Sequence, residues 1–110
     1  MNTGNYNYRY DQRQLKLMAL KILEYKQGLI SLKVLIDDLR SLLGCLKSIS
    51  IEWRERFYNE WFVLEEIYAV TLYRQESLSN YVGEIQEVIK KLKYQIQELS
   101  QNDSDDLFNE

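Results

Sequence analysis

Residues 31–46 read SLKVLIDDLRSLLGCL, and this stretch decides the fold. Its apolar side chains recur every three or four residues, a spacing that places them on one face of an α-helix. They are Leu32, Leu35, Ile36, Leu39, Leu42, Leu43 and Leu46. Lys33, Asp37 and Ser41 lie on the opposite side, and Ser31 is a favourable N-cap. The stretch predicts an amphipathic helix that begins after Ser31 and buries its leucines.

Three further segments have the same periodicity. One is expected to begin near Asp11, a favourable N-cap, and to end at Gly28. A long helix is expected over about residues 51–75, because Ser48-Ile49-Ser50 breaks the preceding pattern and offers an N-cap. A fourth begins after Ser77 or Ser79, and its heptad-like apolar spacing suits packing at a shallow angle. The sequence therefore predicts an all-α, single-domain antiparallel bundle of about four helices.

Charge separates the bundle from a C-terminal tail. The net charge is −3, yet the first hundred residues are almost neutral, and the last ten carry four acidic and no basic side chains. We predict a bundle over residues 11–100, a flexible or loosely docked N-terminus over 1–10, and an acidic flexible tail over 101–110. The apolar pair Leu107 and Phe108 could dock on another surface, but a frayed terminus is the favoured interpretation.

The third predicted helix is the most apolar around its circumference. One side carries Trp53, Phe57, Trp61, Leu64, Tyr68 and Leu72. Tyr58, Phe62, Ile67 and Ala69 widen this apolar arc beyond a single stripe. We therefore expect this helix to be central and contacted by several others, with its two tryptophans in the core.

The composition argues against an enzyme. The chain has no histidine, the commonest general base and the usual zinc ligand, and Cys45 is its one cysteine. The four glycines are scattered and form no phosphate-binding loop. No dense basic patch indicates direct binding of nucleic acid. We predict no catalytic residues, no bound metal and no cofactor.

The sequence also predicts a cytoplasmic protein. Charged residues interrupt every apolar run before it reaches the ~18 residues that a membrane span needs. The Asn- and Tyr-rich start lacks the apolar core of a secretion signal, and a single cysteine forms no internal disulfide. An exported chain given without its signal stays an open alternative.

A candidate binding surface lies on the third predicted helix. At 100° per residue, one sector of this helix gathers acidic and polar side chains opposite Trp53 and Leu64. Its members are Glu52, Glu55, Asn59, Glu66 and Tyr73. This stripe is a candidate docking surface for a basic partner, and the alternative is a solvated face that Arg56 partly neutralises.

Three other carboxylates need separate interpretations. Glu65 points between Trp61 and Ala69, so we expect it to bond a tyrosine hydroxyl or an arginine at the edge of the core. Asp37 and Asp38 point away from the leucine face, where either solvent or a partner can contact them. They join the predicted partner-binding residues.

Part of the chain resembles a known family. The runs LIDDL at 35–39, EW at 52–53 and WFVLEEIYA at 61–69 lie between Ser31 and Arg74. In these runs the chain is similar to small helical bacterial proteins encoded beside polymorphic toxins, including immunity proteins of contact-dependent growth inhibition systems. The likeness covers somewhat under half of the chain, and both termini lie outside it.

This resemblance implies tight binding to the C-terminal domain of a toxin delivered by a neighbouring cell. Many such toxins are nucleases, including RNases, and a nuclease site is basic because it holds phosphates. An acidic helical face can occupy such a site and exclude the nucleic acid. The alternative function is a non-catalytic adaptor or a regulatory homodimer formed through the heptad-like fourth helix.

Overall fold

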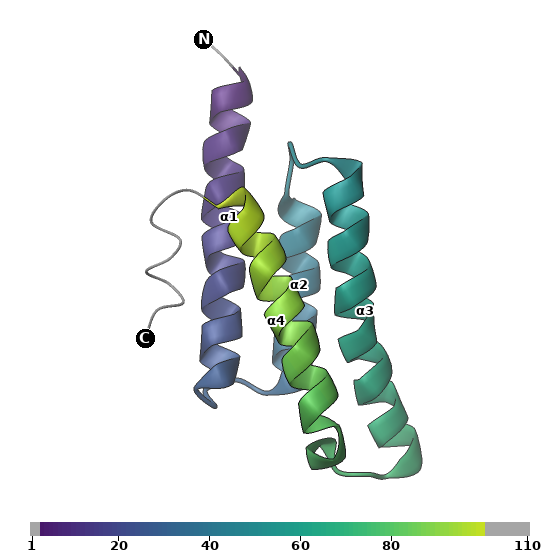
Figure 1. The fold of residues 1–110 in the computed structure, drawn as a ribbon. Helices are drawn as coiled ribbons and strands as arrows, with labels where there is room; N and C mark the ends of the chain where they lie inside the picture. The colour runs from purple at the N-terminus through teal and green to yellow at the C-terminus, as the bar shows by residue number, and fades with distance from the viewer. Residues whose placement is uncertain (1–2, 101–110) are drawn as a thin grey trace.

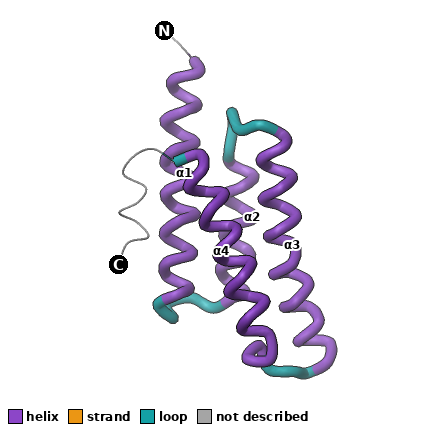
Figure 2. The backbone as a smooth tube through the Cα atoms, in the orientation of Figure 1, coloured by secondary structure: helices purple, strands orange, loops and turns teal. Residues whose placement is uncertain are grey.

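The computed structural model describes residues 3–100, which form a four-helix bundle (Figure 1). The helices are α1 (Thr3–Lys26), α2 (Leu32–Cys45), α3 (Ile51–Arg74) and α4 (Val82–Leu99), with a short 3-10 helix η1 (Leu78–Tyr81) before α4. No strand occurs within the described part of the chain (Figure 2). The predicted all-α fold is confirmed. The predicted flexible tail at 101–110 lies outside the described residues.

Successive helices run antiparallel and close into a ring, in which each packs mainly against two neighbours (Figure 1). Thus α1 contacts α2 and α4, and α3 also contacts α2 and α4. The inward faces of all four helices form one apolar core. Its most deeply buried side chains include Leu15, Met18, Ile22, Leu35, Ile36, Leu39, Phe57, Trp61, Leu64, Leu92 and Ile96.

Local signals explain most helix ends. The hydroxyl of Ser31 accepts a hydrogen bond from the amide of Val34, and Ser50 accepts one from Trp53, each at 3.2 Å. Both serines therefore satisfy amides that would otherwise lack a helical partner. Gly28 has a φ of 78°, and its loop returns amides to the last carbonyls of α1. These predicted boundaries are confirmed.

The start of α1 differs from the prediction. The helix begins at Thr3 rather than near Asp11, so it extends into the segment expected to be flexible or loosely docked. Asp11 is 2% exposed, and its carboxylate accepts the amides of Lys47 and Ser48, each at 2.8 Å. A residue type that often caps its own helix here caps the distant loop between α2 and α3.

The prediction of a central α3 is also wrong. The helix packs on two neighbours, as the others do, and its remaining side is open to solvent. Tyr58, Phe62 and Ala69, which were expected to widen the buried arc, are exposed, as is Leu72. In a ring of four helices, two contacts cover only part of each circumference, so apolar composition alone does not make a helix central.

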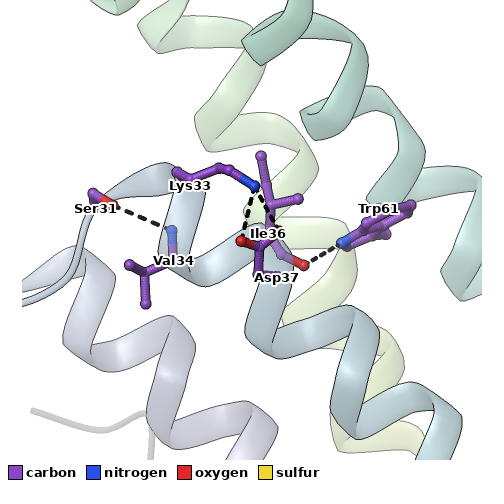
Figure 3. Close-up of polar contacts among 6 residues, drawn as sticks. All are labelled: Ser31, Lys33, Val34, Ile36, Asp37 and Trp61. Carbon is purple, nitrogen blue, oxygen red and sulfur yellow. Dashed lines mark hydrogen bonds and ion pairs between the residues drawn. The ribbon is translucent and has the colours of Figure 1, made fainter.

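Two tryptophans attach α3 to its neighbours. The indole nitrogen of Trp61 donates to the main-chain oxygen of Ile36 on α2 at 2.9 Å (Figure 3). The indole nitrogen of Trp53 donates to the oxygen of Gln95 on α4, also at 2.9 Å. Both side chains are 2% exposed, which confirms their predicted place in the core. Each indole thus buries a large apolar surface while its single donor stays satisfied.

The apolar stripe of α4 is buried inside the bundle. Ile85, Ile89, Leu92 and Ile96 are all buried against the other helices. Val82, at the start of this stripe, is exposed. The heptad-like spacing therefore reflects packing within one chain, and it leaves little apolar surface on α4 for a coiled-coil partner.

We predict that Asp11→Ala lowers the free energy of unfolding by about 2–4 kcal/mol, because two hydrogen bonds to a charged acceptor are lost and both amides stay partly buried. Urea denaturation measures this change. Asp37→Ala is the matched control, because Asp37 is exposed and its ion pair with Lys33 is screened by water. Equal small losses in the two variants would show that Asp11 does not hold the loop.

Candidate functional site: the outer face of α3

The predicted acidic stripe faces solvent. Glu52, Glu55, Asn59, Glu66 and Tyr73 are all exposed, and Tyr73 is 90% exposed. The bonds of Trp53 and Trp61 to α4 and α2 turn this side of α3 outward. We define the outer face of α3 as Glu52, Glu55, Tyr58, Asn59, Phe62, Glu66 and Tyr73.

Three carboxylates of this face have no ion-pair partner among the described residues. Within residues 3–100, Glu52, Glu55 and Glu66 form no ion pair. Arg56, which partly neutralises the stripe in the alternative interpretation of a solvated face, lies 3.5 Å from the carboxylate of Glu98 on α4. The one ion pair that Arg56 forms in the described part of the chain is therefore with α4 and not with the stripe.

Two aromatic rings lie among these carboxylates. Tyr58 is 42% exposed and Phe62 41% exposed. Their ring centres lie 6.0 Å apart, and those of Tyr58 and Trp61 lie 5.3 Å apart. Because the buried Trp61 supports both rings, they are held in place without a partner. Such rigid, half-exposed aromatic side chains are typical anchors at protein interfaces.

Tyr58 and Phe62 were predicted to lie in the apolar arc, but both are exposed. The signal was the angular position of Phe62, which points between Glu55 and Ala69 on a helical wheel and lies only 20° from Glu55, at the edge of the acidic sector. Tyr58 lies midway between Glu55 and the buried Trp61, 60° from each, so its direction gave no such signal. The apolar character of both residues assigned them to the core. The outer face is therefore a mixed acidic and aromatic surface.

A shallow groove of about 640 Å³ borders this face between α2 and α3. Its lining includes Glu55, Tyr58 and Asn59 from the outer face, together with Arg40 and Arg54. The guanidinium of Arg40 lies 5.8 Å from the ring centre of Trp61. Arg54 donates to the main-chain oxygens of Leu43 and Leu46, which satisfies carbonyls at the end of α2. The groove could receive one projecting side chain from a partner.

The two aspartates of α2 point in different directions. Asp37 is exposed and binds Lys33 at 2.8 Å, a hydrogen bond that raises the pKa of Lys33 (Figure 3). Asp38 is half-buried and lies 3.5 Å from Lys21 of α1. Asp38 therefore belongs to the contact between α1 and α2 and does not extend the outer face of α3.

Glu65 has a different environment from the one expected. It is half-buried, but among the described residues it bonds neither a tyrosine hydroxyl nor an arginine. Its negative charge instead contributes, after the larger effect of Asp37, to the raised pKa of Lys33. Glu65 thus lies beside the α2–α3 contact without a fixed hydrogen-bond partner there.

Within residues 3–100, no group of three or more acidic or cysteine side chains is placed to hold a metal ion. None of the described helices has both the length and the apolar character that crossing a bilayer requires. No protein-family model, curated protein or solved structure matches the chain. The resemblance to immunity proteins therefore stays a prediction from the sequence.

Phe62→Ala should cost only about 1 kcal/mol of unfolding free energy, because much of this ring is already in water. Phe57→Ala, which removes a fully buried ring from the same helix, should cost about 3–5 kcal/mol. Chemical denaturation of the two variants gives the comparison. If Phe62→Ala were as damaging as Phe57→Ala, Phe62 would be a core residue and not a surface anchor.

Proposed function

We propose that this chain is a cytoplasmic immunity protein that binds a toxin domain and blocks its active site, without catalysis of its own. The supporting observation is the outer face of α3, where exposed carboxylates surround two exposed aromatic rings. The class of partner comes from the resemblance of residues 31–74 to immunity proteins of contact-dependent growth inhibition systems.

The charge of the outer face favours a basic partner. Glu52, Glu55 and Glu66 extend over about 21 Å of helix, at a rise of 1.5 Å per residue. A carboxylate row of this length can attract a basic surface from a distance and speed its association. A nuclease domain offers such a surface, because its active site must hold phosphates. RNase activity in the toxin is thus our preferred case.

The aromatic side chains supply a different part of the binding energy. Tyr58 and Phe62 already pack against Trp61. These two side chains therefore lose little conformational entropy when a partner covers them. Interface energy concentrates at such central aromatic residues, while surrounding charges mainly set the rate and the orientation of docking. The outer face combines both kinds of group on one helix.

A homodimer is less well supported than a basic partner. The apolar stripe of α4 is buried within the bundle. Pairing two copies through their outer faces would bring like-charged glutamates together, which is unfavourable in an interface. A non-catalytic adaptor that uses the same face would need a basic partner of another kind, and the partner's identity separates the two functions.

The test uses the C-terminal domain of the toxin encoded beside the gene for this chain. Association is followed by stopped-flow fluorescence or surface plasmon resonance at several salt concentrations. Glu55→Lys with Glu66→Lys reverses two charges on the outer face. Glu84→Lys with Glu87→Lys reverses two exposed charges on α4 and is the matched control.

We expect the outer-face variant to fold normally and to associate at least about tenfold more slowly than wild type, because long-range attraction sets the association rate. The rate of wild type should fall with added salt, since exposed charges are screened over about 8–10 Å. The control variant should stay within about twofold of wild type. Wild-type rate and affinity in the outer-face variant would show that this face is merely solvated.

A further inference from the structure

The groove between α2 and α3 differs in charge from the outer face of α3 beside it. Among the charged residues that line the groove, Arg40 and Arg54 are basic and Glu55 is acidic. On the outer face, Glu52, Glu55 and Glu66 form a row of exposed negative charge. The groove is therefore a place of net positive charge at the edge of a negative surface.

The two guanidinium groups of the groove have different environments. Arg54 is half-buried and donates to the main-chain oxygens of Leu43 and Leu46, which hold it at the end of α2. Arg40 is exposed, and its guanidinium lies 5.8 Å from the ring centre of the buried Trp61. In the described part of the chain, Arg40 forms no ion pair. Arg40 is thus supported by an aromatic ring while its charge can still meet a ligand.

A missing side chain leaves Arg40 uncovered on one side. Gly44 follows Arg40 by four residues, which makes the two positions neighbours on one face of α2, and it also lines the groove. A Cβ atom added at Gly44 would meet nothing within 4 Å apart from its own turn of helix. The space beside Arg40 is therefore open to a group from another molecule.

We propose that this groove binds one carboxylate of the partner, that the guanidinium of Arg40 is the group that holds it, and that this carboxylate lies within an otherwise basic surface. The inference rests on the proposed function, from which it takes the basic surface. A guanidinium presents two parallel N–H groups to a carboxylate, so the pair is specific in geometry as well as in charge. Arg40 thus selects among basic partners.

A nuclease active site has this pattern of charge. Its basic side chains hold phosphates, and a carboxylate can serve there as a general base or as a ligand of a metal ion. When the outer face of α3 covers such a site, Glu55 meets the basic side chains and Arg40 meets the carboxylate. A basic surface without a carboxylate would instead place like charges opposite Arg40, which is unfavourable in an interface.

The rates of binding to the toxin domain encoded beside the gene separate this contact from long-range attraction. Arg40→Gln removes a positive charge, so it should not slow association with a basic partner. It should nevertheless speed dissociation at least about tenfold, because a held carboxylate loses its counter-charge. Lys33→Gln is the matched control, since Lys33 lies about two turns earlier on the same side of α2, pairs with Asp37 and is not among the lining of the groove. This control should dissociate within about twofold of wild type.

Filling the groove tests the same site without a change of charge. Gly44→Gln places an uncharged side chain in the open space and should fold at least as stably as wild type, because Gln is the better helix former. We expect this variant to bind the toxin domain at least about tenfold more weakly, since the carboxylate is displaced. Gly83→Gln, at an equally open position of α4, is the control and should bind as wild type does.

A double-mutant cycle identifies the group that Arg40 holds. Each surface Asp and Glu of the toxin domain is replaced in turn by Asn or Gln and measured against wild type and Arg40→Gln. One replacement should weaken binding to wild type but change binding to Arg40→Gln by less than about twofold, because both changes remove the same contact. Additive losses at every toxin carboxylate would overturn the proposal.

The two proposals fail in different ways. If Glu55→Lys with Glu66→Lys slows association while Arg40→Gln and Gly44→Gln dissociate as wild type does, the carboxylate site is wrong and the proposed function stands. If the toxin domain does not bind the wild-type chain, both proposals are wrong.

Discussion

The rotation of α3 about its own axis depends on two buried indole N–H groups. Trp61 bonds a main-chain oxygen of α2, and Trp53 bonds one of α4, each at 2.9 Å. The two tryptophans differ in direction by 80° around the helix, so Trp61 points toward α2 and Trp53 toward α4. Turning α3 would leave a buried donor unpaired, which costs about 1–3 kcal/mol per group. One orientation is therefore strongly favoured.

This orientation of α3 determines which of its side chains are exposed to a partner. With both tryptophans inward, the glutamates, Tyr58 and Phe62 share the opposite side of α3. The aromatic rings rest on Trp61, so the residue that fastens α3 to α2 also supports the exposed anchors. Core packing and the proposed binding surface are thus linked through a single side chain.

Much of the fold could be predicted from local patterns. The leucine spacing of α2, the caps at Ser31 and Ser50 and the turn at Gly28 are short-range signals, and each is found where it was expected. Asp11 misled the prediction because its partners lie 36 and 37 residues away in another loop. The partner of Arg56 could not be predicted for the same reason, since Glu98 belongs to α4. Long-range pairing of polar groups leaves no periodic trace in the sequence.

The acidic half of the candidate site was predictable, but the aromatic half was not. Direction on a helical wheel placed the glutamates in solvent, whereas apolar character assigned Tyr58 and Phe62 to a core that two neighbouring helices already fill. Hydrogen exchange of the two indole N–H groups, followed by NMR, tests the orientation of α3 most directly. We predict that both protons exchange as slowly as the amides of buried helical residues. Exchange of either proton at the rate of a free indole would contradict the orientation on which the outer face depends.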